Sequence, residues 1–305
     1  MPDPAFRRRK RRFDDDEPSF AKRNRHRRAL PALGAFDGAD GLPEGDRWST
    51  WDQSAPLERG PEPYPRWLVT DLAAVDTELG VLKTGKEADV FLLRRGLPGG
   101  GRSCLLAAKR YRDAGHRMFH RDSAYLEGRR VRESRDTRAM AQRTAAGRQM
   151  IARQWASAEF AALARLHGCG VPVPYPVQVL GTELVLEFIG EPDGSAAPRL
   201  AEIRPGAREL AALWDQLVDA LVVLAIHGLA HGDLSAYNLL VHRGRLTLID
   251  LPQVVDVIAN PRGAEFLDRD AVNVARWFSA RGLTGVATAP EDLPALLRAE
   301  ARLGG

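Results

Sequence analysis

The chain has 305 residues, a hydrophobic fraction of 44% and a formal net charge of +4. That length allows one large domain or two moderate ones with a substantial core. No apolar run is long enough to cross a bilayer, and no apolar stretch follows the basic N-terminus, so we expect neither a membrane partner nor a secretory signal. Cys104 and Cys169 are the only cysteines, which predicts a reducing, cytoplasmic compartment without a disulfide framework or a zinc site.

Residues 1–66 form a predicted disordered tail. Residues 1–28 hold eleven Lys and Arg against five Asp and Glu, and apolar periodicity is nearly absent as far as residue 66. Too little surface could be buried there to offset the entropy of ordering. The arginine blocks could neutralise RNA phosphates, with a solubilising tail as the alternative. Trp48, Trp51 and Trp67 are unusual in such a segment and are candidates for docking on the folded body.

The folded body is predicted to begin near Trp67, with a short helix over residues 69–79. Residues 81–93 then indicate a strand, a glycine turn and a second strand, with Lys83, Thr84 and Lys86 as donors around the turn.

A further predicted strand ends at Lys109. A strand lysine downstream of a glycine turn is typical of a site for the α- and β-phosphates of a nucleotide. A surface lysine is the alternative, but the surrounding apolar run favours an inward, paired side chain.

Residues 110–150 form a predicted basic insertion. From Lys109 to Arg153 there are thirteen Lys and Arg against five Asp and Glu, with few apolar residues at helical spacing. The one-signed charge favours contact with substrate or nucleic acid over a merely solvated segment.

A helix is predicted from about Ala145 to His167, with Glu159 near the edge of its apolar face. If this helix packs against the sheet, Glu159 can pair with Lys109 and aim it at a nucleotide; a solvated glutamate is the alternative.

A change in composition marks a predicted hinge. A hairpin over residues 177–188 leads into a stretch rich in Pro, Gly and Ala that ends at Pro198. We expect adenine to bind backbone groups there, or a plain linker between two lobes. The apolar stripe between Pro205 and Gly228 then predicts the core helix of the second lobe.

Residues 231–250 carry the most specific chemistry in the sequence. Asp233 and Asn238 stand five residues apart, at the H-x-D-x-x-x-x-N spacing of a kinase catalytic loop, and Asp250 follows a predicted hairpin. Asp233 suits the carboxylate that takes a proton from an acceptor hydroxyl, while Asn238 and Asp250 suit Mg²⁺. Taken singly, each would more often be a turn or cap residue. We interpret His231 as structural.

The sequence departs here from an ordinary protein kinase. Gly232 replaces the arginine of H-R-D, and Leu251-Pro252 follows Asp250 in place of F-G. A helix is predicted over residues 264–279 and a final short helix after it, which leaves little room for an activation segment or peptide-docking helices.

With these residues identified, the chain resembles the RIO family of atypical serine/threonine kinases, and its first subfamily most closely. The similarity runs in order from about residue 69 to 279. It rests on seven motifs: Thr84-Gly85-Lys86-Glu87-Ala88-Asp89-Val90, Ala108-Lys109-Arg110-Tyr111, Trp155-Ala156-Ser157-Ala158-Glu159, Glu187-Phe188-Ile189-Gly190, Pro198-Arg199-Leu200, the run from His231 to Asn238, and the run from Ala264 to Asp270.

The resemblance implies an α+β, two-lobed protein-kinase-like fold with a truncated C-lobe: residues 67–190 as the N-lobe and residues 191–305 as the C-lobe. It implies ATP as phosphoryl donor, Mg²⁺ or alternatively Mn²⁺ at Asn238 and Asp250, and Asp233 as the catalytic base. The residues expected around ATP are Lys83, Thr84, Lys86, Val90, Lys109, Glu159, Glu187, Ile189 and Asn238.

The family is linked to ribosomal-subunit maturation, and some members form a phospho-aspartate, which here would be on Asp250. Lys83 stands where the family usually has serine, and Leu251-Pro252 also departs from the family pattern.

Three functions follow. The first is a Mg-ATP-dependent protein serine/threonine kinase, with autophosphorylation or an ATPase switch as variants. The second is a small-molecule phosphotransferase resembling the aminoglycoside enzymes, which share the H-G-D-L…N…I-D arrangement but usually need a larger helical domain afterwards. The third is an RNA- or ribosome-binding assembly factor that uses ATP to time its release, which the basic tail and insertion favour.

Overall fold

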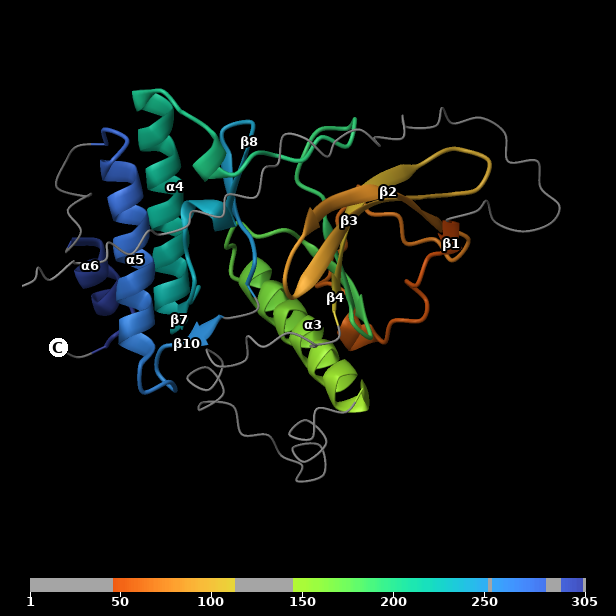
Figure 1. The fold of residues 1–305 in the computed structure, drawn as a ribbon, viewed down its shortest axis with the longest axis horizontal. Helices are drawn as coiled ribbons and strands as arrows, with labels where there is room; N and C mark the ends of the chain where they lie inside the picture. Colours follow the sequence, from red (N-terminus) through yellow and green to blue (C-terminus); the bar gives the residue numbers. More distant parts are fainter. Residues whose placement is uncertain (1–45, 113–144, 252–253, 284–291, 304–305) are drawn as a thin grey trace, which may run out of the picture.

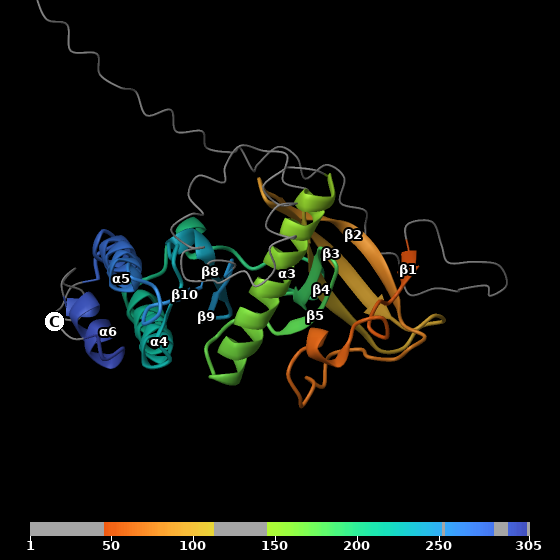
Figure 2. The same cartoon turned by 90° about the horizontal axis from the view of Figure 1, so that it is seen from below.

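The computed structural model describes residues 46–112, 145–251, 254–283 and 292–303 (Figure 1). They form an α+β fold with a sheet at one end and a helical group at the other (Figures 1 and 2). The six-stranded antiparallel sheet has the order β1-β2-β3-β4-β6-β5. Its strands are β1 (Asp46–Trp48), β2 (Val75–Thr84), β3 (Ala88–Gly96), β4 (Ser103–Tyr111), β5 (Pro176–Leu180) and β6 (Glu183–Glu187). No described helix is long and apolar enough to cross a membrane.

Helix α3 (Ala145–Gly168) packs on one face of the sheet, against β4, β5 and β6. Beyond it lie the helices α4 (Ala207–Ile226), α5 (Gly263–Ser279) and α6 (Asp292–Glu300). Two small two-stranded antiparallel sheets sit beside them. One pairs β8 (Leu239–His242) with β9 (Arg245–Leu248), and the other pairs β7 (Leu229–Ala230) with β10 (Val255–Asp256). A continuous apolar core joins α3, α4, α5 and these short strands.

The structure confirms most predicted elements. The hairpin around Gly85, the strand that carries Lys109, the long helix with Glu159, the hairpin before the hinge and the core helix α4 all form. The helix expected over residues 69–79 is wrong, because Val75 begins strand β2 and residues before it lie in turns. The spacing of Leu72, Val75 and Leu79 suggested a helical face, but Leu72 is exposed and β2 pairs with strands on both sides.

The prediction of a disordered tail as far as residue 66 is wrong for residues 46–66. Residues 46–68, here called the N-terminal strap, are ordered and cover the sheet face opposite α3. Strand β1 pairs with β2, and Trp51 is 5% exposed against Tyr64 and the sheet. Burial of this aromatic surface stabilises a segment whose composition looks unstructured. Residues 1–45 lie outside the described residues.

The strap is held by a buried polar network as well. Arg95, on β3, has no exposed surface and donates to both carboxylate oxygens of Asp76, at 2.7 and 2.9 Å, and to Gln178 Oε1 at 2.9 Å. Gln178 in turn donates to Thr50 Oγ1 of the strap at 2.7 Å. The network thus links β2, β3, β5 and the strap, and each of the three guanidinium nitrogens donates one hydrogen bond to an acceptor.

The predicted basic insertion is described only at its ends. Residues 110 and 111 belong to β4, and residues 145–150 belong to α3, so both ends lie in regular structure. Residues 113–144 lie outside the described residues. The nucleic-acid contacts expected for the insertion and for the basic tail therefore stay predictions.

Candidate nucleotide and phosphotransfer site

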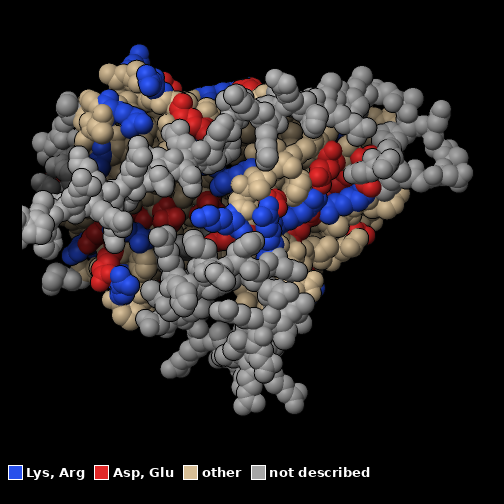
Figure 3. All heavy atoms as spheres, in the orientation of Figure 1, with Lys and Arg blue, Asp and Glu red and all other residues tan. Residues whose placement is uncertain are grey.

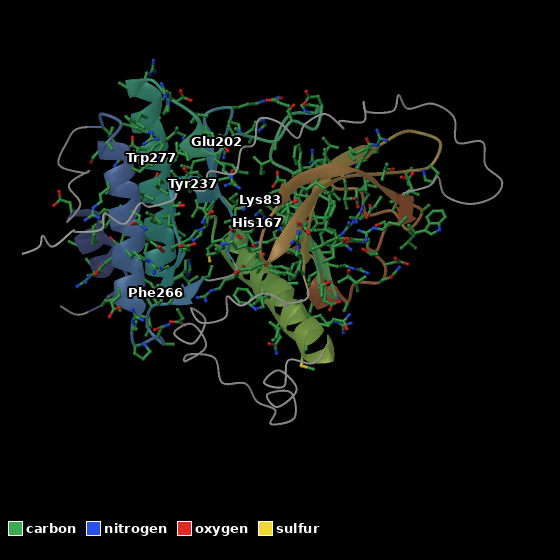
Figure 4. All side chains as sticks on the ribbon, viewed as in Figure 1. Lys83, His167, Glu202, Tyr237, Phe266 and Trp277 are labelled. Carbon is green, nitrogen blue, oxygen red and sulfur yellow. The ribbon has the colours of Figure 1, made fainter. Side chains whose placement is uncertain are left out.

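Three predicted site residues lie in one row across the sheet. Lys83 on β2 is opposite Val90 on β3, which is opposite Lys109 on β4. Directly opposed residues of antiparallel strands project from the same face, so the two lysines flank Val90 on the face that α3 covers. Figure 4 shows Lys83 projecting from the sheet toward the helical group.

Lys109 is paired with two carboxylates. Its Nζ lies 2.8 Å from Glu159 Oε2 and 2.9 Å from Asp250 Oδ1. Burial opposes the charge on Lys109, but the carboxylates of Glu159 and Asp250 raise the pKa of its ammonium group above the usual value. The lysine is therefore a fixed cation that joins the sheet, helix α3 and the segment after β9. Its pairing with Glu159 was predicted, and its pairing with Asp250 was not.

Glu159 is 1% exposed and has three partners. Besides Lys109, it accepts a hydrogen bond from the Tyr111 hydroxyl and one from the Leu251 backbone N–H, the latter at 3.2 Å. Burial and the charge of Glu159 raise the pKa of the Tyr111 phenol, which stays a donor. A buried carboxylate with three donors is well satisfied and fixes the side chains around it.

Asp250 adopts a left-handed backbone with φ of 64°. Non-glycine residues seldom occupy this region, and aspartate is among the few that tolerate it. Burial raises the pKa of its carboxyl, but Lys109, with smaller contributions from Lys83 and His231, lowers it to about 2. The carboxylate is thus ionised under all ordinary conditions.

The loop before β8 holds Asp233 and Asn238 together. Asn238 Nδ2 donates to the Asp233 carbonyl at 2.9 Å, and the Ile249 N–H donates to the Asn238 carbonyl at 2.9 Å. The second contact extends the β8–β9 pairing and brings the chain just before Asp250 alongside Asn238. Asp233 itself is exposed.

Asn238 and Asp250 offer oxygen atoms of the kind that bind divalent cations. Because Asn238 donates through Nδ2, its Oδ1 is directed elsewhere, and one amide and one carboxylate oxygen suit an ion that keeps waters and phosphate oxygens as its other ligands. The described residues contain no group of three or more His, Cys, Asp and Glu that could hold a metal ion. The two predicted ligands therefore fit an ion that a nucleotide's phosphates help to hold.

Asp270, for which no role was predicted, holds this loop in place from helix α5. It is 2% exposed on α5, and its two oxygens accept from the Gly232 N–H at 2.6 Å and the Leu234 N–H at 2.9 Å. Burial raises the pKa of the Asp270 carboxyl, against the charge of His231 and the two N–H donors. The sequence did contain a signal for Asp270. It is a carboxylate shortly after Phe266-Leu267, on a helix face that is otherwise apolar.

His231 and Gly232 complete the support of the loop. His231 is 1% exposed, with Nε2 3.1 Å from the Ile249 carbonyl and Nδ1 accepting from the Asp233 N–H at 3.4 Å. These contacts support the structural role predicted for His231. Gly232 has φ of 90°, and its carbonyl accepts a hydrogen bond from Arg269 Nη2.

The remaining predicted residues of the glycine turn differ in position. Thr84 lies one residue after Lys83, so its side chain is on the opposite sheet face, where it hydrogen-bonds to Asp89. Lys86 is exposed on the turn between β2 and β3. Of the two strand residues predicted to contact phosphates, Lys83 projects from the face that carries Lys109 and Thr84 from the opposite face.

At the hinge, some of the backbone groups predicted to bind adenine already have hydrogen-bond partners within the chain. The Glu187 N–H donates to the Tyr175 carbonyl at 2.8 Å, and Glu187 Oε2 accepts from the Tyr175 N–H at 3.0 Å. Burial raises the pKa of the Glu187 carboxyl. The Ile189 carbonyl accepts from the Ala197 N–H at 2.9 Å, and the Ile189 N–H has no partner among the described residues.

Comparison with known proteins agrees with this geometry. The model of the RIO domain family matches residues 107–291, which include the paired lysine, its two carboxylate partners and the whole catalytic loop. The chain belongs to the RIO family.

Two RIO relatives are archaeal. The chain is 38% identical over 209 residues to a RIO-type serine/threonine-protein kinase Rio1 of Haloferax volcanii, covering 68% of this chain and 65% of the relative. It is 36% identical over 129 residues to a protein of the same name from Thermoplasma acidophilum, covering 42% of this chain and 66% of the relative.

A human serine/threonine-protein kinase RIO3 is 38% identical over 134 residues, covering 44% of this chain and 25% of the relative. This chain thus spans less than two thirds of the length of each of these RIO relatives.

Proposed function

We propose that the chain is a Mg-ATP-dependent serine/threonine protein kinase of the RIO type. The observation that carries the proposal is the pairing of Lys109 with Glu159 and Asp250, beside the loop that holds Asp233 and Asn238. A fixed cation, two oxygen ligands and an exposed carboxylate are the parts that phosphoryl transfer requires. The names of the archaeal and human relatives point to the same activity.

The nucleotide would lie against the sheet face that carries Lys83, Val90 and Lys109. Val90 offers an apolar surface to the base or ribose, and the two ammonium groups offer charge to the phosphates. The N–H of Ile189 is the hinge donor best suited to adenine, and Glu187 contributes its backbone carbonyl. Helix α3 keeps Lys109 directed inward through Glu159.

Asp233 would orient the acceptor hydroxyl and take its proton while the bond to the γ-phosphorus forms and the bond to the leaving ADP oxygen breaks. Asp270 positions Asp233 by holding the N–H groups on either side of it. A bound Mg²⁺ at Asn238 and Asp250 would neutralise charge on the phosphates. The function of Asp250 in this scheme requires an ionised carboxylate, which its low pKa of about 2 provides.

The fold supports the two-lobed, kinase-like arrangement implied by the resemblance. The sheet with α3 would be the N-lobe, and α4 with the β8–β9 hairpin and α5 the C-lobe. Only residues 257–262, in turns and a bend, separate β10 from α5, so the described residues have no long segment there in which an activation loop could form.

The decisive experiment uses ³²P-labelled ATP with Mg²⁺ and a generic protein substrate, followed by separate measurement of acid-stable and acid-labile protein phosphate. We expect acid-stable phosphate on Ser or Thr, reduced about 100-fold or more in Asp233→Asn because the general base is lost. Nucleotide binding by Asp233→Asn, measured calorimetrically, should equal that of the wild type. Label only in an acid-labile form would instead indicate a phospho-aspartate ATPase, and phosphate transferred only to small molecules would refute the protein kinase.

A further inference from the structure

Tyr111 contacts both members of the Lys109–Glu159 ion pair, although no role at the site was predicted for it. It ends β4, two residues after Lys109, so its side chain projects from the same face of the sheet. The residue is 7% exposed. Its hydroxyl donates to Glu159 Oε2, and Lys109 Nζ lies over its ring, 5.3 Å from the ring centroid. One side chain thus contacts the cation with its face and the carboxylate with its hydroxyl.

The backbone of Tyr111 is held by the sheet. Its N–H donates to the Thr182 carbonyl, in the turn between β5 and β6, at 3.0 Å. The next residue is fixed as well, because the Arg112 N–H donates to the Glu87 carbonyl at 2.8 Å. The hydroxyl of Tyr111 is therefore presented from the same hydrogen-bonded layer that carries Lys109.

The contacts of Glu159 with the described residues divide evenly between its two oxygens. Lys109 Nζ lies 2.9 Å from Oε1 and 2.8 Å from Oε2. Oε1 also accepts from the Leu251 N–H, and Oε2 accepts from the Tyr111 hydroxyl. Leu251 follows Asp250 directly, so its N–H moves with the segment that carries the predicted metal ligand. Tyr111 instead ties the carboxylate to the strand that carries Lys109.

Lys109 differs from the cations at the surface in how closely it is held. Figure 3 shows Lys and Arg side chains gathered in a band between the region of β8 and that of β2 and β3. The Lys109 side chain, by contrast, is 12% exposed, and its ammonium group lies between Glu159 and Asp250. A shift of the Glu159 carboxylate therefore shifts the cation, and a misplacement of about 1 Å is costly for a group that acts in catalysis.

A purely structural role is the alternative for Tyr111, because its ring belongs to the apolar core between the sheet and α3. Phenylalanine would fill that space equally well. Tyrosine adds a hydroxyl, and a buried hydroxyl needs an acceptor. The acceptor here is the carboxylate that pairs with Lys109. The buried Tyr175 differs, since its hydroxyl donates to the Pro61 carbonyl on the opposite face of the sheet.

We propose that Tyr111 is a positioning residue for phosphoryl transfer: its hydroxyl holds Glu159 so that the Lys109 ammonium stays aligned with Asp250 and with the phosphates of the nucleotide. The proposal rests on the proposed function, and Tyr111 acts in it through Glu159 and Lys109 rather than on the reacting atoms. The hydroxyl transfers no proton in this role. It remains a donor, because burial and the charge of Glu159 raise the pKa of the phenol.

The test compares Tyr111→Phe with Tyr175→Phe in the full chain. Both substitutions remove the hydrogen-bonding hydroxyl of a buried tyrosine and keep its ring, and the backbone contacts of Tyr175 at the hinge remain. Initial rates with ³²P-labelled ATP, Mg²⁺ and a generic protein substrate give kcat and the KM for ATP. Urea denaturation verifies that each variant is fully folded under the assay conditions, so that a loss of stability is not mistaken for a loss of rate.

We expect Tyr111→Phe to lower kcat about 10-fold and to change the KM for ATP less than about twofold, because the charge of Lys109 is kept and only its alignment is lost. Tyr175→Phe should retain the wild-type kcat. The same substitution at Tyr111 is also made in Glu159→Ala, where the hydroxyl has no carboxylate to hold. There it should have no further effect on kcat, which a merely structural role would not produce.

A wild-type kcat in Tyr111→Phe, or an equal loss in Tyr175→Phe, would overturn the positioning role. So would a loss in the Glu159→Ala background as large as that in the wild type, since Tyr111 would then act without Glu159. A raised KM for ATP at unchanged kcat would also overturn it and assign Tyr111 to nucleotide binding. If Glu159→Ala does not fold, the comparison of Tyr111→Phe with Tyr175→Phe decides alone.

The same experiment separates this proposal from the proposed function. If the wild-type chain transfers no phosphate, the kinase function itself is refuted. If the wild type transfers phosphate and Tyr111→Phe matches it in kcat, only the positioning role is refuted.

Discussion

The backbone N–H of Leu251 donates a hydrogen bond to Glu159 Oε1 over 3.2 Å. This contact ties the residue after the predicted metal ligand Asp250 to helix α3, independently of Lys109. Glu159 is therefore more than the partner of a lysine, because the same carboxylate sets the path of the chain beyond β9.

This arrangement predicts that mutations of the ion pair affect the free energy of unfolding and phosphoryl transfer differently. Lys109→Met leaves the Glu159 and Asp250 carboxylates without their cation, and removal of one partner of a buried pair costs about 3 kcal/mol. The double variant Lys109→Met with Glu159→Gln should recover part of that free energy of unfolding but none of the phosphoryl transfer. Urea denaturation and labelled-ATP assays measure the two effects, and equal stability of the single and double variants would contradict the account.

Acid should weaken the fold through Asp250. Its pKa is about 2 in the folded protein, below the ordinary value of 3.8, so its contribution to stability is complete above about pH 4 and disappears as the pH falls toward 2. The carboxyl of Asp270 has a raised pKa in the folded protein, so its protonation favours the folded state as the pH falls. The Asp250 side chain is 38% exposed, so solvent screening limits the effect. Unfolding followed between pH 2 and 5 should show a shallower loss of stability in Asp250→Asn than in the wild type.

Asp270 should behave as a positioning residue. In Asp270→Asn one of the two N–H groups of the loop faces an amide that cannot accept, so we expect kcat to fall at least about 10-fold because small misplacements of a catalytic group are costly. The dissociation constant for ATP should change little. Asp268, on the same helix as Asp270, pairs with Arg298 of α6 near the surface. Asp268→Asn removes only that ion pair, so it is the matched control and should leave kcat unchanged. A change confined to ATP affinity would argue against positioning.

The left-handed backbone at Asp250 gives a prediction that is separate from its charge. Asp250→Gly and Asp250→Ala both remove the carboxylate, but a φ of 64° suits glycine and strains alanine. The alanine variant should be less stable by about 1 kcal/mol, as measured by chemical denaturation. Identical stabilities would show that the loop relaxes once the carboxylate is gone.

The N-terminal strap can be tested with two tryptophans three residues apart. Both belong to the strap, but Trp51 is 5% exposed, whereas Trp48, on β1, is 55% exposed. Trp51→Ala should lower the free energy of unfolding by about 3 kcal/mol or more, as large aromatic truncations in cores do. Trp48→Ala should cost clearly less, and a similar loss in both variants would indicate that the strap does not form a true second layer.

The strands and helices that carry the site could be predicted because their signals are local. A glycine turn between apolar runs, an apolar run ending in Lys109, and an amphipathic helix with Glu159 at its edge each follow from a few neighbouring residues. The pairing of Lys109 with Glu159 was predicted from the strand and helix that carry them, whereas its second pairing, with Asp250, was not predicted.

The failures of prediction arise where distant residues decide the structure. Residues 75–79 have apolar spacing that fits a helix, but pairing with β1 and β3 makes them a strand. The strap looked unstructured because the surfaces that bury Trp51 come from residues more than a hundred positions away, such as Tyr175 and Val177. Asp270 carries only the weak signal of a carboxylate on an otherwise apolar helix face, since its role comes from backbone N–H groups of another segment.

The fully enclosed Arg95 also bears on how the sheet assembles. Its guanidinium finds acceptors only when β2, β3 and β5 have come together, and the Gln178 amide that it meets is itself anchored by Thr50. Any intermediate that closes the sheet without the strap would enclose the Gln178 amide without its Thr50 and Ser54 acceptors. Folding of this layer should therefore be cooperative, with the N-terminal strap added as part of one concerted transition rather than as a late attachment.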